Sequence, residues 1–462
     1  MHTGKITDNT SGLLTAVFRD CPIQDHLELK EKLKRFLDVP LSQLVEQNKG
    51  VLIFPSVLND HDDGIGKASI CMLQGDTLKT GNILGFIGYG NVRLSITSRF
   101  DQGGSDFFLH YMLQKVLSLN VFDLKAGRAE DEVWDFFLYF FPHYLHRAIS
   151  QGVFREYHHR VFNDSNVRGT IDVARHLRLN VPFAGKVAYR TREYLHDNRM
   201  TQLIRHTIEF IKTKEHARGI LSANQEIRDA VEDIIAVTPT YAKSQRQQII
   251  SKNLRSVSHP YYTEYLPLQK LCLQILRHEK LSYGDDAEEI YGILFDGAWL
   301  WEEYLAVMLR EIDPEVRHPR NNTGQGRDCI FEGNGQYIYP DFIKMKDKLT
   351  AHYVVDAKYK HIDRKSDKMS RDDYFQVITY MYRYECNQSC ILFPYDDEDK
   401  QLFKQVRYVK GNTLNRFILE LGLSIPAARS FGDFKLFVAN MEKNAKEALN
   451  TMVSKLSCSS TK

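Results

Sequence analysis

Two aspartates and a lysine in the last third of the chain have the types and spacing of a metal-dependent hydrolytic site. Asp341 lies in the segment 336–343, and Asp356 and Lys358 lie two residues apart in the segment 352–359. Residues two apart in a strand point to the same side, so a strand over 352–359 places the Asp356 carboxylate beside the Lys358 ammonium. Adding the Asp341 carboxylate at the same place is costly unless a divalent cation neutralises the acids.

Mg²⁺ is the cation that this donor set predicts. It takes hard oxygen ligands, retains several waters, and leaves positions open for a phosphate oxygen and an attacking water. Lys358 would then either orient and help to deprotonate that water or stabilise the charge that builds up on the phosphate. The expected chemistry is hydrolysis at a phosphate.

A third carboxylate is expected from the segment 293–305, an apolar stretch interrupted by acids that we predict to be helical. Glu302 is the preferred third metal ligand, and its neighbour Glu303 is the alternative. Either acid would otherwise face solvent on the surface of the helix.

Downstream of the lysine, Ser370 and Asp373 form a capping-box pattern that predicts the start of a helix. This helix carries Gln376 and Tyr380, which are four residues apart and therefore share a helical face. Gln376 would steady the attacking water or a phosphate, with Tyr380 beside it. The alternative is that both residues only contribute to packing.

The elements that must bring the two acids together are a pair of strands. The segments 336–343 and 352–359 are both predicted to be strands, and the polar residues 346–348 between them form a turn. We therefore expect a β-hairpin with Asp341 and Asp356 on adjacent strands.

Around this hairpin, the residue pattern divides the chain into three regions. Residues 1–105 form a β-rich N-terminal module, 106–287 a mainly helical middle region, and 288–462 an α/β domain with a central mixed sheet and a C-terminal helical tail. The polar segment 282–286 is the expected second boundary, and Asn198 is an expected helix N-cap in the middle region.

The composition is that of a folded multidomain protein, with 462 residues, 43% hydrophobic and 26% charged. The net charge of +2 excludes an all-over polycation, so contact with nucleic acid must come from a local basic groove or from a partner. No run of signal-peptide or membrane-spanning type is evident, and the seven cysteines form no C-x-x-C pair. These features predict a cytoplasmic protein with reduced thiols and no membrane contact.

The ordered set of these motifs resembles the PD-(D/E)xK nuclease superfamily in its Q-x-x-x-Y form. More narrowly, the chain resembles the McrC-type nuclease subunit of McrBC and LlaJI-like restriction systems over roughly residues 85–395. The segments that carry the resemblance are Tyr339-Pro340-Asp341-Phe342, Val355-Asp356-Ala357-Lys358-Tyr359, Arg168-Gly169-Thr170-Ile171-Asp172 and His196-Asp197-Asn198-Arg199.

This resemblance implies an α+β multidomain fold whose C-terminal domain is restriction-endonuclease-like. It also implies an Mg²⁺-dependent endonuclease that cuts double-stranded DNA in antiviral defence and stimulates an McrB-type AAA+ GTPase. The N-terminal module would engage that partner, which binds GTP and recognises modified DNA. This chain is expected to bind no nucleotide, because the loop-like segment Gly64–Ser69 lacks the spacing of a phosphate-binding loop.

Two other functions remain open at this stage. One is a catalytically silent DNA-binding adaptor that only activates the GTPase motor, and intact acids and lysine argue against it. The other is a DNA-repair or junction-resolving nuclease of the same superfamily. Outside the nuclease motifs, a helix cap at Asn198 and an ion pair between Arg168 and Asp172 are sufficient structural roles for those residues.

Overall fold

A computed structural model places the two ends of the chain in one unit and the middle of the chain in another. The first unit comprises Met1–Phe122 and Asp286–Lys462, and the second comprises Asp123–Asp285. The residues that the structure describes are 2–48, 50–55, 65–101, 106–117, 129–214, 217–281, 290–319, 328–332, 336–361, 369–396, 402–410, 415–427 and 434–457. The expected loop 282–286 lies outside them. None of the helices in this described part is both long and apolar enough to span a membrane.

A five-stranded mixed sheet forms the N-terminal part of the first unit. Its order is β1-β7-β6-β11-β3, in which β1 runs parallel to β7 and β11 runs parallel to β3. The strands are β1 (His2–Thr7), β3 (Gly50–Phe54), β6 (Ile83–Tyr89), β7 (Val92–Thr97) and β11 (Ile290–Asp296). Strands β1, β3, β6 and β7 lie within residues 1–105, the part of the chain that was expected to be β-rich.

Smaller elements cover this sheet and bury an apolar core against it. The helix α2 (His26–Leu37) contributes Leu29, Leu33 and Phe36, which recur at helical spacing and are buried. The remaining elements are β2 (Ser11–Leu13), α1 (Leu14–Val17), the 3-10 turns Ile23–Asp25 and Ile65–Lys67, α3 (Leu41–Gln47), β4 (Cys71–Gln74) and β5 (Thr77–Thr80). The helix α4 (Phe107–Leu117) follows this sheet in the chain and packs on α11 (Gly297–Ile312) and α13 (Phe434–Ser457).

Strand β11 corrects the prediction of a helix over 293–305. Residues 293–296 belong to the strand, and the helix α11 (Gly297–Ile312) begins only after Asp296, whose side chain accepts a hydrogen bond from the Ala298 backbone N–H. The reason is that a short apolar run fits a fully buried strand as well as a helix. As a result, a strand that follows the middle region is paired within the N-terminal sheet.

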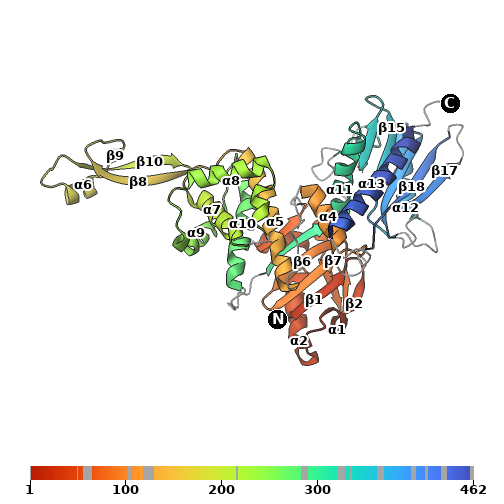
Figure 1. The fold of residues 1–462 in the computed structure, drawn as a ribbon, viewed down its shortest axis with the longest axis horizontal. Helices are drawn as coiled ribbons and strands as arrows, with labels where there is room; N and C mark the ends of the chain where they lie inside the picture. The colour runs from red at the N-terminus through yellow and green to blue at the C-terminus, as the bar shows by residue number, and fades with distance from the viewer. Residues whose placement is uncertain are drawn as a thin grey trace. The chain divides into compact units, whose positions relative to one another are not determined.

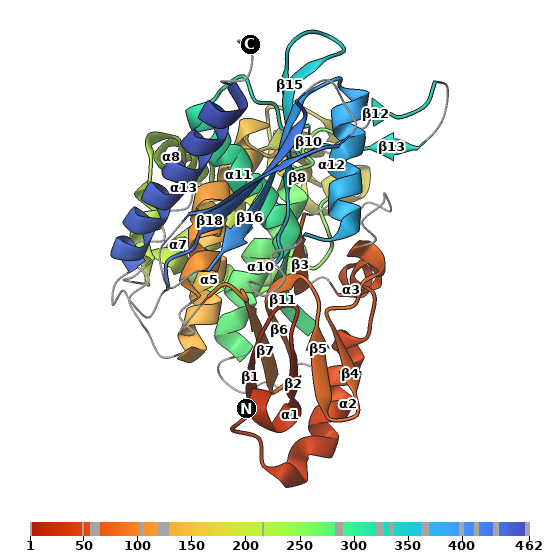
Figure 2. The ribbon, with the colours of Figure 1, turned by 90° about the vertical axis from the view of Figure 1, so that its right-hand side faces the viewer.

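A second five-stranded mixed sheet, ordered β14-β15-β16-β18-β17, forms the C-terminal part of the same unit. Its strands are β14 (Phe342–Met345), β15 (Ala351–Ala357), β16 (Gln388–Tyr395), β17 (Phe403–Tyr408) and β18 (Phe417–Ser424), with β12 (Asp328–Cys329) and β13 (Tyr337–Ile338) paired separately. The helix α12 (Arg371–Arg383) lies on one face, and α11 and α13 (Phe434–Ser457) lie on the other (Figure 2). The predicted central mixed sheet and C-terminal helix are thus confirmed.

The second unit contains helices and a long pair of strands. The helices are α5 (Ala129–Ser150), α6 (Val173–Leu179), α7 (Arg199–Lys212), α8 (Gln225–Val237), α9 (Arg246–Asn253) and α10 (Tyr265–Leu281), with 3-10 turns at Arg218–Ser222 and Lys243–Gln245. Strands β8 (Glu156–Asp164) and β10 (Val187–Leu195) pair antiparallel over nine residues, and the ribbon extends away from α7, α8 and α9 with β9 (Thr170–Ile171) and α6 at its far end (Figure 1).

This ribbon qualifies the expectation of a mainly helical middle region. Tyr157, Val161 and Tyr194 are exposed on it, and Ala188 and Tyr189 are the only buried residues of its two long strands. Burial therefore imposes no regular apolar alternation on this part of the sequence. The predicted ion pair between Arg168 and Asp172 is also wrong, because the Asp172 carboxylate instead contacts Arg190, with 2.8 Å between Oδ2 and Nη2.

The cap predicted at Asn198 is confirmed and leads to a stability prediction. Its buried side chain accepts hydrogen bonds from the N–H groups of Met200 and Thr201 and donates one to the Phe154 carbonyl. We expect Asn198→Ala to cost about 2 kcal/mol and to lower the midpoint of thermal unfolding by several degrees. Asn224→Ala removes the simpler cap of α8 and should cost about half as much. Equal shifts for the two variants would contradict this account.

Candidate active site

The hairpin of β14 and β15 brings the two predicted acids together. Phe342 pairs with Val355, so Asp341, one residue before β14, lies beside Asp356 near the end of β15. The Asp341 Oδ2 atom accepts a 2.7 Å hydrogen bond from the Ala357 N–H, which ties one strand to the other. Asp341 is 8% exposed and Asp356 is 1% exposed, so both carboxylates lie in a poorly solvated place.

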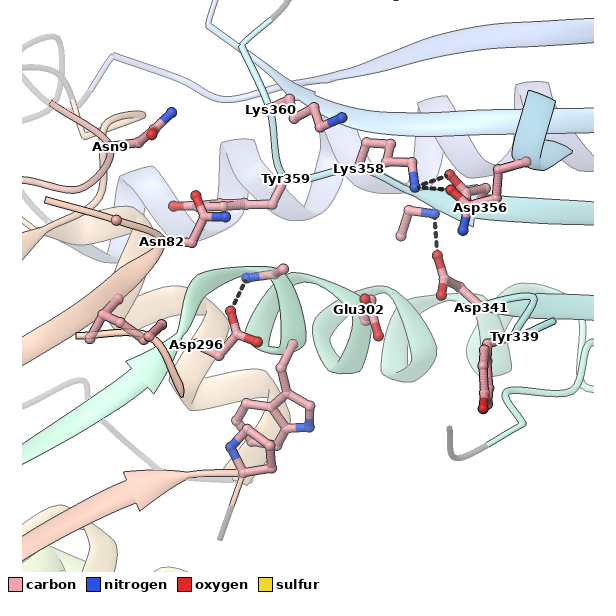
Figure 3. A pocket seen from close by; sticks show the side chains of 18 of the residues that line it. Asn9, Asn82, Asp296, Glu302, Tyr339, Asp341, Asp356, Lys358, Tyr359 and Lys360 are labelled. Atoms are coloured by element: carbon pink, nitrogen blue, oxygen red, sulfur yellow. Dashed lines mark hydrogen bonds and ion pairs between the residues drawn. The ribbon is translucent and has the colours of Figure 1, made fainter. Parts of the chain in front are cut away.

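Lys358 completes the cluster from the residue after β15. Its Nζ atom lies 2.9 Å from Asp356 Oδ2 and donates a 2.7 Å hydrogen bond to Gln376 Oε1 (Figure 3). Its backbone N–H donates to the Leu392 carbonyl of β16 at 2.9 Å. The predicted side-by-side placement of Asp356 and Lys358 is therefore what the structure shows.

The charged groups of this cluster shift one another's pKa values. Burial, and after it the charge of Asp356, raises the pKa of Asp341 to about 7. Burial also raises the pKa of Asp356, against the opposing effect of Lys358. Burial lowers the pKa of Lys358, but the nearby carboxylates, Asp356 first, outweigh it and the net shift is upward. The lysine is thus held as a cation, and the acids carry more negative charge than their surroundings stabilise.

Gln376 and Tyr380 lie on the same helix face and are connected to the lysine. The capping box is present, with Ser370 as the N-cap of α12 and Asp373 as its reciprocal partner. Gln376 Nε2 donates to the Tyr380 hydroxyl at 2.7 Å, and that hydroxyl donates to the Tyr339 carbonyl at 2.9 Å. This chain of hydrogen bonds orients the Gln376 amide so that its oxygen faces Lys358.

The structure separates Glu302 from Glu303. Glu302 lines the same cavity as Asp341 and Asp356, facing it from α11 (Figure 3). Glu303 instead lies 3.6 Å from Nε2 of His318, and the Nδ1 atom of His318 is hydrogen-bonded to the Asp341 carbonyl at 2.7 Å. Burial lowers the pKa of His318, but Glu303 outweighs it and the net shift is upward. Glu303 therefore supports the backbone at Asp341 indirectly, whereas Glu302 is the acid that faces the cavity.

The cavity itself has a volume of about 1270 Å³ and is shared by the two five-stranded sheets of the first unit. The catalytic candidates lie on the side formed by the C-terminal sheet and α12. The N-terminal sheet and the loops after β1 and β5 supply the other side, including Asn9, Asn82 and Arg99. The predicted boundary near residue 105 thus separates two parts of the chain that enclose one cavity.

Two charged residues at the site were not among the predicted set. Asp373 is a cap, but its carboxylate also lies 2.8 Å from Lys360 Nζ and 3.8 Å from Lys358 Nζ. Lys360 lines the cavity and is about half exposed. The i+2 spacing from Lys358 to Lys360 was a local signal for the second lysine, because residues two apart in an extended chain share a side.

The carboxylates of the cavity form an open donor set that fits a divalent cation. Asp356 Oδ1 is buried and has no hydrogen-bond partner among the described residues. Within the same part of the chain, no three His, Cys, Asp or Glu side chains come together as a closed metal site requires. An open pair of carboxylates suits Mg²⁺, which is often held by one or two protein acids plus waters and substrate phosphate.

Comparisons with known proteins identify the family of this chain. A family model described as "McrBC 5-methylcytosine restriction system component" matches residues 78–394, which is more than half of the chain. The matched range includes Glu302, Asp341, Asp356, Lys358, Gln376 and Tyr380. No curated protein gave a significant match.

Solved structures provide a second comparison. A chain of the refined half-complex from the tetradecameric assembly of Thermococcus gammatolerans McrB AAA+ hexamers with bound McrC is 15% identical, with a TM-score of 0.55; the match covers 97% of this chain and 100% of that one. A chain of the Thermococcus gammatolerans McrBC complex is 14% identical, with a TM-score of 0.32, 66% of this chain and 87% of that one being covered. The first match shows a shared fold, and the family match over residues 78–394 shows that this chain belongs to the McrBC 5-methylcytosine restriction system component family.

Proposed function

We propose that this chain is the DNA-cleaving subunit of a modification-dependent restriction system. In this proposal, its C-terminal sheet and helices form a PD-(D/E)xK nuclease domain that hydrolyses phosphodiester bonds of double-stranded DNA with Mg²⁺. The single observation that carries the proposal is the convergence of Asp341, Asp356 and Lys358 at one end of the β14–β15 hairpin, inside a cavity. Fold stability alone gives no reason to bury two acids side by side.

Asp341 and Asp356 would hold Mg²⁺, with Glu302 as a further carboxylate from across the cavity. When bound, the ion would supply the positive charge that polarises the phosphate and favours ionisation of the attacking water. The Ala357 N–H keeps one Asp341 oxygen in place, so that residue is already oriented before a ligand arrives.

Lys358 would act as a fixed cation. Since its pKa is raised, it remains protonated at neutral pH and is a poor base. Its ion pair with Asp356 and its hydrogen bond to Gln376 leave the ammonium at the edge of the cavity, where it would stabilise charge on the phosphate and orient the water. Of the two roles considered from the sequence, the electrostatic one is favoured.

An McrB-type AAA+ GTPase is the proposed partner. The matched Thermococcus gammatolerans structure is described as McrB AAA+ hexamers with bound McrC, and its fold extends over nearly all of this chain. In the proposed system the partner binds GTP and selects modified DNA, while this chain stimulates the GTPase and cuts.

A reconstituted cleavage assay tests the proposal. The chain, an McrB-type GTPase, GTP and Mg²⁺ are mixed with plasmid DNA that either contains 5-methylcytosine or lacks it. We expect linear product only from the methylated plasmid and only when all four components are present, with EDTA abolishing it. Stimulated GTP hydrolysis without any cutting would instead identify a catalytically silent adaptor.

Tyr380→Phe provides a finer test of the hydrogen-bond chain. The variant removes the hydroxyl that accepts a hydrogen bond from Gln376 Nε2 and donates one to the Tyr339 carbonyl. We expect about a tenfold lower cleavage rate, because an amide that rotates loses the oxygen that faces Lys358, and a stability loss of about 1 kcal/mol. Tyr382→Phe, on the exposed side of the same helix, is the control. Equal cleavage rates for the two variants would remove Tyr380 from the site.

A further inference from the structure

The residue that follows Lys358 is held by the N-terminal sheet. Strands β1 and β7 run parallel, with Thr7 paired to Thr97, so the residues after them leave the sheet at the same end. Asp8 and Arg99 are among those residues, and they form an ion pair. The end of the N-terminal sheet therefore meets the end of β15, although about 260 residues separate Arg99 from Tyr359 in the sequence.

Arg99 is the centre of this junction. Its Nη2 atom lies 3.1 Å from Asp8 Oδ2, and its backbone N–H donates to Asp8 Oδ1 at 2.6 Å. The same Nη2 donates to the Tyr359 carbonyl at 3.1 Å and to Asn82 Oδ1 at 2.8 Å. The side chain of Arg99 is 7% exposed and that of Asp8 is fully buried, so neither charge can move to solvent without breaking the contacts.

The side chain of Tyr359 is enclosed from several elements. Its hydroxyl and that of Ser98 are 2.7 Å apart, and the Arg99 guanidinium lies 4.8 Å from the centre of its ring. A Cβ atom added to Gly297, the first residue of α11, would lie 2.8 Å from the ring. Tyr359 thus packs directly on the helix that carries Glu302, and there is no free space for the ring to shift in that direction.

These contacts fix the backbone on both sides of Lys358. The Lys358 N–H is bound to the Leu392 carbonyl of β16, and the carbonyl of the next residue is bound to Arg99. The Lys358 ammonium must remain between Asp356 and Gln376 to stabilise charge on the phosphate. A displacement of about 1 Å at a catalytic group can cost about a hundredfold in rate.

We propose that Arg99 is a positioning residue for Lys358, through which the N-terminal sheet holds the catalytic amine in place. This inference rests on the proposed nuclease function and adds a residue from outside the nuclease domain to the reaction. It assigns Arg99 no contact with DNA or with the metal. The predicted effect is on the rate of the chemical step and not on the binding of DNA.

The experiment compares steady-state kinetics of the full chain with its GTPase partner, using methylated plasmid. The double variant Asp8→Asn with Arg99→Gln removes both buried charges together, so no unpaired charge remains to unfold the junction. We expect kcat to fall about tenfold to a hundredfold with KM for DNA unchanged. Arg99→Lys keeps the pair with Asp8, but one ammonium cannot serve Asp8, Asn82 and Tyr359 together, and we expect a fall of about threefold or more.

Arg35→Ala is the matched control. Arg35, on α2, also donates to a tyrosine hydroxyl, that of Tyr89 in the N-terminal sheet at 2.7 Å, and its guanidinium lies 5.5 Å from that ring centre. Neither residue lines the cavity. The kcat of Arg35→Ala should equal that of the wild type. A kcat within twofold of wild type for both Arg99 variants, or an equal loss for Arg35→Ala, overturns the positioning role while leaving the nuclease function intact. A wild-type chain that never cuts overturns the proposed function itself and this inference with it.

Discussion

Replacing Asp356 or Lys358 with alanine should lower the rate of DNA cleavage by at least about a thousandfold, which corresponds to about 4 kcal/mol of transition-state stabilisation. Asp356 holds a buried oxygen without a hydrogen-bond partner in the described part of the chain, and Lys358 is the cation beside it. Both variants remove charge from the place where the phosphate would react. Cleavage of methylated plasmid with the GTPase partner measures the effect.

Stimulation of the partner's GTPase by these variants should stay within about twofold of wild type, because the substituted side chains lie in the cavity and keep their backbone pairing. Controls come from the opposite end of the same hairpin. Asp347→Ala removes an exposed turn aspartate whose partner is Thr350, and Lys348→Ala removes an exposed turn lysine. Cleavage by these two should equal wild type. Full activity in the Asp356 and Lys358 variants would refute the assigned site.

The site was predictable from the sequence because its geometry is largely local. Asp356 and Lys358 are two residues apart, and the turn after β14 brings Asp341 back beside them. The start of α12 at Ser370 was likewise predictable from a capping pattern that spans only four residues. In each case the physical signal, strand alternation or a cap, acts over a few residues and can be recognised without tertiary information.

The parts that could not be predicted depend on contacts between distant segments. Strand β11 is apolar because its residues are buried on both faces of the sheet, and a buried helix would show the same composition. In the β8–β10 ribbon only Ala188 and Tyr189 are buried, so burial imposes no regular alternation. The contact of Arg99 with Tyr359 joins the N-terminal sheet to the active site with no local pattern at either residue. Such features follow from topology, which a single sequence does not specify.

Replacing Asp341 with asparagine should make the metal-free protein more stable while abolishing cleavage. The asparagine oxygen can still accept the hydrogen bond from the Ala357 N–H, but the charge facing Asp356 is gone. At pH 8 in EDTA we expect the midpoint of thermal unfolding to rise by about 5 °C. Saturating Mg²⁺ should reduce the difference between the unfolding midpoints of the variant and the wild type, because the ion stabilises only the wild-type pair of carboxylates.

The pH dependence gives the sign of this effect. Burial raises the pKa of Asp341 to about 7 in the folded chain, so the folded state binds more protons than the unfolded state between about pH 4 and pH 7. The contribution of Asp341 to wild-type stability in EDTA therefore falls as the pH rises through this window, and Asp341→Asn should remove this contribution to the pH dependence. Asp313→Asn is the control with the opposite sign. Asp313 forms a 2.7 Å ion pair with Lys344, which outweighs burial and lowers the pKa of Asp313, so its loss should destabilise the protein at neutral pH. Equal destabilisation by both substitutions would mean that Asp341 is an ordinary structural acid. Removing the charge of an acid stabilises the folded protein only where that charge lowers the free energy of unfolding.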